Sequence, residues 1–175
     1  MDVIAYATLV RSRDILEREA FEATVLRETR RLYVLALSIL RDDGEAEDAV
    51  QETLVKAWRS RRELGELDAI GRWLTRVCVN HCISRRRHLL LRGWMHREPL
   101  HEVAAKPDTR MTAELMDVDR AYRRLSVKQR AAITLNYRHG YSIDECAVLM
   151  QCRPGTVRSH VARGLATLRK ELHDG

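Results

Sequence analysis

The chain has 175 residues, a formal net charge of +6 and a sequence pI of about 9.4. This length suits one ordinary domain or two small ones, and the basic balance favours a polyanionic partner. The four cysteines do not resemble a secreted disulfide framework, and no apolar stretch approaches the ~20 residues that cross a bilayer. The N-terminal segment has neither a basic region nor a cleavage site, so we expect a cytoplasmic protein without membrane insertion.

Helical periodicity dominates the sequence, because only 3 prolines and 8 glycines interrupt it and strand-type alternation is scarce. We predict an all-α fold of two small helical domains, residues 1–95 and 113–175, joined by a flexible linker at residues 96–112. The linker is placed where the periodicity fails around Pro99 and Pro107. Its length exceeds that of a typical connection inside a compact domain.

The first predicted helix runs from near Leu16 to Leu40, whereas residues 1–15 give no clear pattern. A turn follows, in which Gly44 is expected to supply the conformation that other residues resist. The second predicted helix, residues 45–59, buries an apolar face made of Ala46, Ala49, Val50, Thr53, Leu54, Ala57 and Trp58.

Residues 42–52 contain six acidic residues and no basic one. Composition alone favours carboxylates that stabilise a helix start through the helix dipole. The alternative is a docking surface for a positively charged protein.

The third predicted helix begins at Ala69, and residues 69–97 contain seven arginines, three histidines and no acid. Trp73 and Trp94 lie within this basic stretch. Such a combination suits single-stranded or opened nucleic acid, because phosphates pair with arginine and bases stack on aromatic rings.

The same helix offers thiol and imidazole groups that are known zinc ligands, at Cys78, His81, Cys82 and His88. One helix seldom supplies a closed four-ligand site, and cysteine is often a small buried hydrophobe. We therefore interpret Cys78 and Cys82 as structural residues and predict no metal site.

Two capping boxes organise the C-terminal half, which follows a short predicted helix at residues 116–124. Ser126 with Gln129 begins a helix that runs through Tyr137, and Ser142 with Glu145 begins the next. Gly140 is expected to terminate the first of these two helices.

A tight turn at residues 150–153 leads to a helix that starts at Pro154, where its fixed φ is favourable. This last helix is apolar on one face and basic on the other, and no acid occurs between Cys146 and Lys170. A short capped helix, a turn and a basic helix make a helix-turn-helix, whose second helix can lie in the major groove of DNA.

Three segments resemble those of the extracytoplasmic-function (ECF) sigma factors, the smallest type of bacterial RNA polymerase specificity subunit. Residues 46–53, AEDAVQET, followed by Ala57-Trp58, are similar to the polymerase-docking helix of the family. Residues 73–87 resemble its promoter-melting helix, and residues 155–169, which begin GTVRSH, resemble its upstream-element recognition helix. The three segments occur in the order and spacing of the family.

The resemblance implies a sigma factor that is not an enzyme and needs no cofactor. Core RNA polymerase would bind, through the clamp helices of its largest subunit, to Asp48, Gln51 and Glu52. The opened minus-ten promoter element would contact Arg72, Trp73, Arg76, Asn80, Arg85 and Arg87. The duplex minus-thirty-five element would contact Thr156, Arg158, Ser159, His160 and Arg163. Residues 60–68 would capture a flipped base, and an anti-sigma factor would hold the protein inactive.

The sequence departs from the family pattern at several positions. Val79 stands where a basic residue is common, which alters the expected strand-binding surface, and His160 stands where arginine is usual. Gln151 replaces the common turn glycine. A non-glycine residue in the left-handed conformation costs roughly 1 kcal/mol, so either the turn differs or it is slightly strained.

A helix-turn-helix regulator of the response-regulator type is the closest alternative interpretation. Its recognition helix also carries a Thr-Val-x-Ser-His run like residues 156–160. It leaves the segments at residues 46–53 and 73–87 unexplained.

Overall fold

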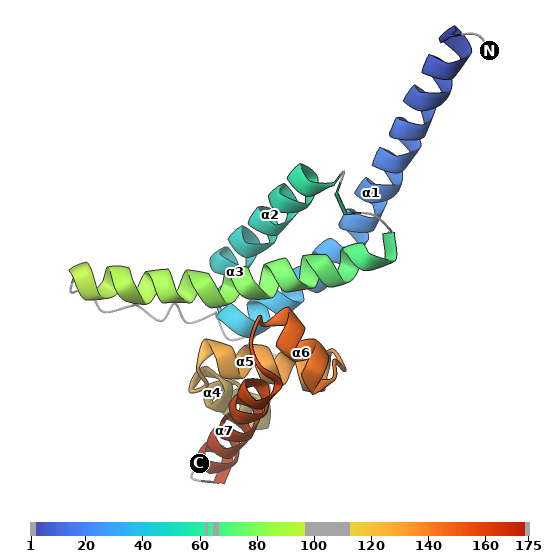
Figure 1. Ribbon diagram of the computed structural model, residues 1–175. Helices are drawn as coiled ribbons and strands as arrows, with labels where there is room; N and C mark the ends of the chain where they lie inside the picture. Colours follow the sequence, from blue (N-terminus) through green and yellow to red (C-terminus); the bar gives the residue numbers. More distant parts are fainter. Residues whose placement is uncertain (1–2, 62, 65–66, 97–112, 174–175) are drawn as a thin grey trace.

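The computed structural model describes the backbone of residues 3–61, 63–64, 67–96 and 113–173, and side chains at 18–61, 63–64, 70–84 and 117–173. All regular structure in this part of the chain is helical, which confirms the predicted fold class. The elements are α1 (Val3–Leu40), α2 (Asp43–Ser60), α3 (Leu67–His96), α4 (Ala113–Arg123), α5 (Val127–Ile133), η1 (Thr134–Arg138), α6 (Ile143–Leu149) and α7 (Pro154–His173) (Figure 1). The predicted linker lies almost wholly outside the described residues. Among those that are described, no helix meets the length and apolarity of a membrane span.

Helices α1, α2 and α3 pack against one another and form the N-terminal half (Figure 1). The periodicity placed α1 from near Leu16, but the helix begins at Val3. A helix that is nucleated in a packed segment extends at little further cost, even where its sequence has no clear apolar face. The predicted core face of α2 is confirmed for five residues that are buried, namely Ala46, Ala49, Val50, Thr53 and Ala57.

The turn between α1 and α2 corrects one prediction. Arg41, with a φ of 64°, adopts the left-handed conformation, whereas Gly44 lies inside α2. The Arg41 amide donates to the Leu37 carbonyl at 2.8 Å, which closes α1 with a single left-handed residue. Asp42 then caps α2, because its carboxylate accepts from the Glu45 amide at 2.8 Å.

Both predicted capping boxes are present in the C-terminal half, formed by α4 to α7. The helix that starts after Ser126 departs from expectation, because its last five residues form the π-helical turn η1. The His139 amide there reaches back five residues to the Thr134 carbonyl, at 3.1 Å. Gly140 follows with a φ of 71°, as expected for the residue that terminates the helix.

The two halves pack together, and their buried apolar residues form one continuous cluster. Helix α3 runs across α5 and α6, and the C-terminal end of α1 lies against α5 (Figure 1). Arg130 of α5 is only 6% exposed, and its Nε donates to the Ile39 carbonyl of α1 at 2.6 Å. An ion pair between Arg41 and Asp119 also joins the halves.

Candidate polymerase and nucleic-acid interfaces

The acidic face of α2 is directed to solvent. Asp48, Gln51 and Glu52 are all exposed, at spacings of three and four residues that place them on one side of the helix. Val55, 44% exposed, continues the same side by one turn. The opposite side of α2 is buried, so the helix has a core face and a solvent-exposed polar face.

Trp58 was predicted to lie on the buried face of α2, and this prediction is wrong. Its side chain is 38% exposed and is not part of the core. Its ring lies 6.4 Å from the Phe21 ring, and the guanidinium groups of Arg18 and Arg61 lie 5.2 and 4.1 Å from its centroid. These cations stabilise a half-exposed indole at the end of α2. Residues 60–68, expected to capture a flipped base, lie partly outside the described residues.

The predicted minus-ten residues of α3 are mostly half-buried. Arg72 is exposed, Trp73 packs against the core, and Arg76 is half-buried. Asn80 donates through Nδ2 to the Arg76 carbonyl at 2.7 Å and to the Leu149 carbonyl of α6 at 2.8 Å. The side chains of the two remaining predicted residues, Arg85 and Arg87, are outside the described set.

The burial of Val79 corrects the prediction that this residue alters the strand-binding surface. Its side chain is fully buried, so in this arrangement it is part of the core and does not change the exposed surface of α3. The prediction assumed a surface position because a basic residue is common there in the family. Valine is apolar, so it can pack in the core.

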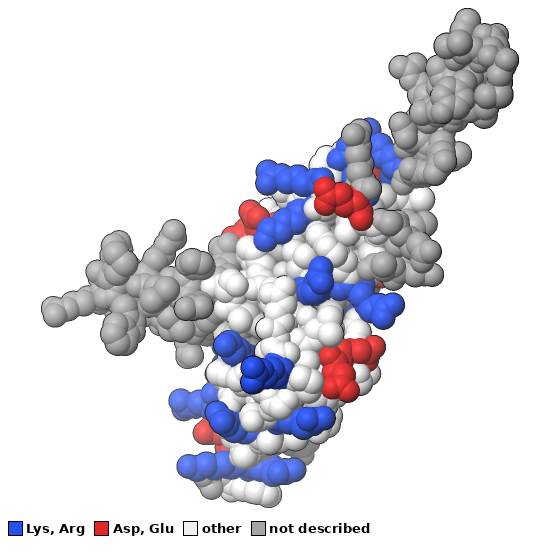
Figure 2. Space-filling model, in the orientation of Figure 1, with Lys and Arg blue, Asp and Glu red and all other residues white. Residues whose placement is uncertain are grey.

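Four of the five predicted groove residues of α7 are open to solvent. Thr156, Arg158, Ser159 and Arg163 are exposed, while Val157 and Gly164 on the other side of the helix are buried. The structure therefore gathers the four polar groups on one face of a helix that is free along that face. Figure 2 shows basic side chains spread over the C-terminal half, where acidic side chains are few.

His160 is half-buried on the same helix. Burial lowers the pKa of its imidazole, and the nearby charges of Lys128 and Arg163 lower it further. Lys128 comes from the first turn of α5 and was not predicted as a site residue. The sequence holds no local signal for this neighbour, because only the packing of α5 on α7 brings the two residues together.

The turn of the helix-turn-helix has a glutamine in the left-handed conformation that glycine usually adopts. Gln151 has a φ of 51°, so the strained alternative is the one adopted. Its amide donates to the Val148 carbonyl at 3.3 Å, and the Cys152 amide donates to the Ala147 carbonyl at 3.0 Å. This pair of bonds is the Schellman pattern, which satisfies the last carbonyls of α6 and directs the chain into α7.

Cys78 and Cys82 are fully buried, as predicted for structural cysteines, and all four cysteines are free thiols. A hydrogen bond with Cys78 and burial both raise the pKa of Cys82, and burial raises that of Cys146 to about 11. The thiols of Cys82 and Cys146 are therefore protonated at neutral pH. In the described part of the chain, no three histidine, cysteine or acidic residues are grouped so as to hold a metal ion.

Two family models match the chain. The model for Sigma-70 region 2 matches residues 24–89, which include α2 and most of α3, and that for Sigma-70, region 4 matches residues 115–168. The first match includes residues 46–53 and 73–87. These are the segments that a helix-turn-helix regulator leaves unexplained. The class of protein is thus a sigma factor of the sigma-70 type.

Individual relatives narrow the class. The chain is 33% identical over 156 residues to the ECF RNA polymerase sigma factor SigM of Mycobacterium tuberculosis, covering 89% of this chain and 79% of that one. It is 28% identical over 174 residues to the RNA polymerase sigma-H factor of Pseudomonas aeruginosa, covering 89% and 88%. The chain belongs to the ECF sigma factors, which bind core RNA polymerase and direct promoter-specific initiation of transcription.

Solved structures agree with this assignment. The sigma factor RpoE from Bartonella quintana, crystallised in complex with the anti-sigma factor NepR, matches with a TM-score of 0.72 and 29% identity. The match covers 87% of this chain and 96% of that one. CnrH, in complex with the cytosolic domain of CnrY, shares the fold at a TM-score of 0.57 and 21% identity.

Proposed function

We propose that three separate surfaces divide the work of this sigma factor. The acidic face of α2, with Asp48, Gln51 and Glu52, docks on the clamp helices of the largest polymerase subunit. The polar face of α3 holds the opened minus-ten strand, and the exposed face of α7 enters the major groove of the minus-thirty-five element. The boundaries of the two domains that carry these surfaces, 1–95 and 113–175, are part of the proposal.

One observation carries this division: the acidic face of α2 and the basic face of α7 are both exposed, on different elements of one chain. Opposite charges on separate helices favour two partners of opposite charge. A basic docking surface on a protein suits α2, and the phosphates of DNA suit α7.

The chemistry of α7 supports direct reading of bases. An arginine that donates two hydrogen bonds to guanine discriminates against other bases by ~1–3 kcal/mol. Arg158 and Arg163 have exposed side chains that can make such contacts, with Thr156 and Ser159 beside them. His160, whose pKa is lowered, contributes a neutral imidazole at neutral pH.

The role of α3 is not catalytic. Extruding a base from the duplex costs a few kcal/mol. Contacts of Arg72, Arg76 and Asn80 with the displaced strand, together with Arg85 and Arg87, offset that cost. The protein therefore lowers the free energy of strand opening by binding one product of it, without chemical conversion of the DNA.

The division of labour is tested by run-off transcription with core polymerase, together with a polymerase pull-down. Asp48→Arg should abolish binding to the polymerase and leave the affinity of α7 for duplex promoter DNA within about twofold, because the two surfaces lie on different helices. Arg163→Ala should do the reverse. Loss of polymerase binding in the Arg163→Ala variant would refute the assignment.

We also propose that an anti-sigma factor keeps this protein inactive in the cytoplasm. The support is the match to RpoE, whose solved structure is a complex with the anti-sigma factor NepR. Co-purification of the tagged protein with a single stoichiometric partner that blocks polymerase binding is the expected result. The proposal would be contradicted if the sigma factor, purified with all its bound partners, were fully active in transcription with core polymerase.

A further inference from the structure

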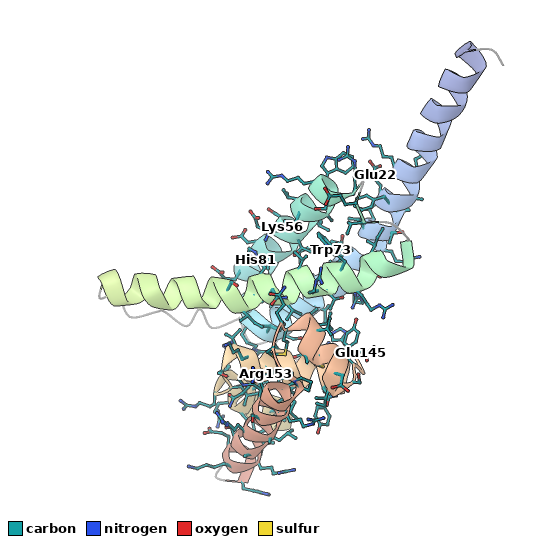
Figure 3. All side chains as sticks on the ribbon, viewed as in Figure 1. Glu22, Lys56, Trp73, His81, Glu145 and Arg153 are labelled. Atoms are coloured by element: carbon teal, nitrogen blue, oxygen red, sulfur yellow. The ribbon has the colours of Figure 1, made fainter. Side chains whose placement is uncertain are left out.

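A cavity of about 340 Å³ lies where the C-terminal end of α1 meets α4 and η1. Its lining includes three charged and two phenolic side chains, those of Arg41, Asp119, Arg138, Tyr122 and Tyr137. Pockets for small molecules typically measure about 300–1,000 Å³. None of the described lining residues belongs to α2, α3 or α7; Figure 3 labels Lys56 on α2 and Trp73 on α3. The cavity is therefore separate from the three surfaces proposed above.

Positive charge exceeds negative charge among the described side chains at this cavity. Asp119 is the one carboxylate in the described lining, and both of its oxygens are occupied, because Arg41 donates to Oδ1 and Arg123 donates to Oδ2 at 2.9 Å. The Nε atom of Arg41 is buried, and no described residue accepts a hydrogen bond from it. Arg138 donates to the Ser38 hydroxyl at 3.1 Å. The cavity thus offers a buried donor and a second guanidinium whose described partner is uncharged, and both suit an anion.

Two departures from ordinary helical backbone occur in the walls of the cavity. Arg41 has a φ of 64°, a left-handed conformation that, among the described residues other than glycine, recurs only at Gln151. The turn η1 is the one π-helical segment in the described part of the chain, and it supplies Thr134, Tyr137 and Arg138 to the lining. Backbone strain and π-helical turns both concentrate at functional sites. Their coincidence with an unpartnered buried donor favours a ligand site over an accidental gap in the packing.

The remaining walls favour a flat apolar group. Tyr122 is half-buried, and its hydroxyl shares a hydrogen bond of 2.6 Å with the Thr134 hydroxyl, which fixes the ring between α4 and η1. Tyr137 is 63% exposed and Val118 is 46% exposed, so both are accessible from solvent. Aromatic rings pack on one another, and flat guanidinium groups stack on rings. The charge of Asp119 in the same lining disfavours a dianion such as a phosphate monoester, so a monocarboxylate fits better.

We propose that this cavity binds a small aromatic carboxylate, whose charged group contacts Arg41 and Arg138 and whose ring packs against Tyr122 and Tyr137. The proposal does not depend on the roles of α2, α3 and α7, because it uses none of their residues. The walls belong to both halves of the chain. A bound ligand therefore stabilises the folded protein and the contact between α1 and η1.

The test uses the full chain and 2-naphthoate as the probe, titrated in an isothermal calorimeter. The neutral isostere 2-naphthamide is the matched ligand control, because it keeps the ring and removes the charge. We expect one 2-naphthoate site per chain and a dissociation constant about tenfold higher for 2-naphthamide, since hydrogen bonds to a charged group are the stronger ones. Equal affinities of the two probes, or no binding of 2-naphthoate up to about 10 mM, would overturn the proposal.

A pair of arginine variants locates the site. Arg138→Met removes a guanidinium from the lining, and Arg120→Met removes the same charge from an exposed position of α4 outside the lining. We expect the dissociation constant of 2-naphthoate to rise about five- to tenfold in Arg138→Met and to stay within about twofold in Arg120→Met. Equal effects of the two substitutions would show that the probe follows surface charge, and the cavity would be excluded as its site.

Two further measurements test the class of ligand and its coupling to folding. Tighter binding of 2-naphthyl phosphate than of 2-naphthoate would overturn the choice of a carboxylate. Saturating 2-naphthoate should raise the midpoint of thermal unfolding in the unmodified protein and in Arg120→Met, and raise it less in Arg138→Met. An unchanged midpoint in the unmodified protein would contradict binding to the folded state. Neither result bears on the roles proposed for α2, α3 and α7.

Discussion

The two helices proposed to contact DNA, α3 and α7, differ in what surrounds their polar faces. In α7 the fully buried positions are Val157 and Gly164, half-buried residues flank them, and the opposite side of the helix is exposed. In α3 the core touches several sides, and α6 covers part of the remaining face. In this arrangement the face of α7 that we propose for duplex DNA is exposed, whereas part of the face of α3 that we propose for an opened strand is packed against the C-terminal half. Four predictions follow that difference, from the largest expected effect to the smallest.

Replacing Arg130 should have the largest effect, because this residue holds the C-terminal half against α1. Arg130→Met keeps much of the side-chain volume but removes two hydrogen bonds from a charged donor to the Ile39 and Leu125 carbonyls. We expect the free energy of unfolding to fall by ~2–4 kcal/mol, measured in urea. Arg138→Met, at an exposed contact between the same halves, should change it by less than ~0.5 kcal/mol. An unchanged stability of Arg130→Met would show that the buried guanidinium does not hold the halves together.

A substitution at Gly164 tests whether α7 packs closely against α5 on its buried side. A Cβ added there would lie 2.6 Å from the Ile133 Cδ1 atom and 3.4 Å from the Gln129 Cβ atom of α5. Gly164→Ala should therefore force the Ile133 side chain to shift, and overpacking of ~1–3 kcal/mol, reduced by the ~1 kcal/mol that alanine gains as a helix former, leaves a net loss of up to ~2 kcal/mol.

The matched control for Gly164 is Gly155→Ala on the same helix. No atom lies within 4 Å of a Cβ at this position. Alanine is the better helix former, so we expect a gain of up to ~1 kcal/mol. Thermal unfolding of both variants gives the measurement. Opposite signs would confirm that α7 is packed on one side alone, and a loss at both positions would contradict it.

The turn before α7 is strained at Gln151. Removing this strain should raise the free energy of unfolding, by less than the substitutions above lower it. Gln151→Gly should raise the free energy of unfolding by ~0.5–1 kcal/mol, because glycine adopts the left-handed conformation without the penalty of a side chain. The midpoint of urea unfolding should rise with an unchanged slope. Gly140→Ala, which places a side chain at a φ of 71°, should lower stability and so serves as the reverse control. A destabilised Gln151→Gly would mean that the glutamine side chain contributes more than its strain removes.

Local signals predicted most of the helices and the exposed sites, because they act within one turn. The two capping boxes and Pro154 placed the starts of α5, α6 and α7, and helical spacing placed the exposed faces of α2 and α7. The sequence did not predict which residue adopts a left-handed φ at the end of α1, since Arg41 does so although Gly44 is three residues away. Arg130 looked like one more basic residue, and only tertiary packing reveals that it joins α1 to the turn between α4 and α5. The burial of Val79 and the hydrogen bond from Asn80 to the Leu149 carbonyl likewise depend on contacts between residues that are distant in sequence.

The smallest expected effect concerns charge on α7. Burial and the neighbouring charges of Lys128 and Arg163 lower the pKa of His160 below its usual value near 6.5, so the imidazole is neutral at pH 7.5. As the pH falls through that lowered pKa, the free protein gains a positive charge on the groove face. DNA phosphates favour the charged form, so affinity for duplex promoter DNA should rise about two- to threefold between pH 7.5 and pH 5.5. In His160→Gln this dependence should be weakened, whereas in His173→Gln, at the far end of α7, it should persist. The same pH profile in His160→Gln as in the unmodified protein would exclude His160 from the groove face and leave Thr156, Arg158, Ser159 and Arg163 as the proposed groove residues.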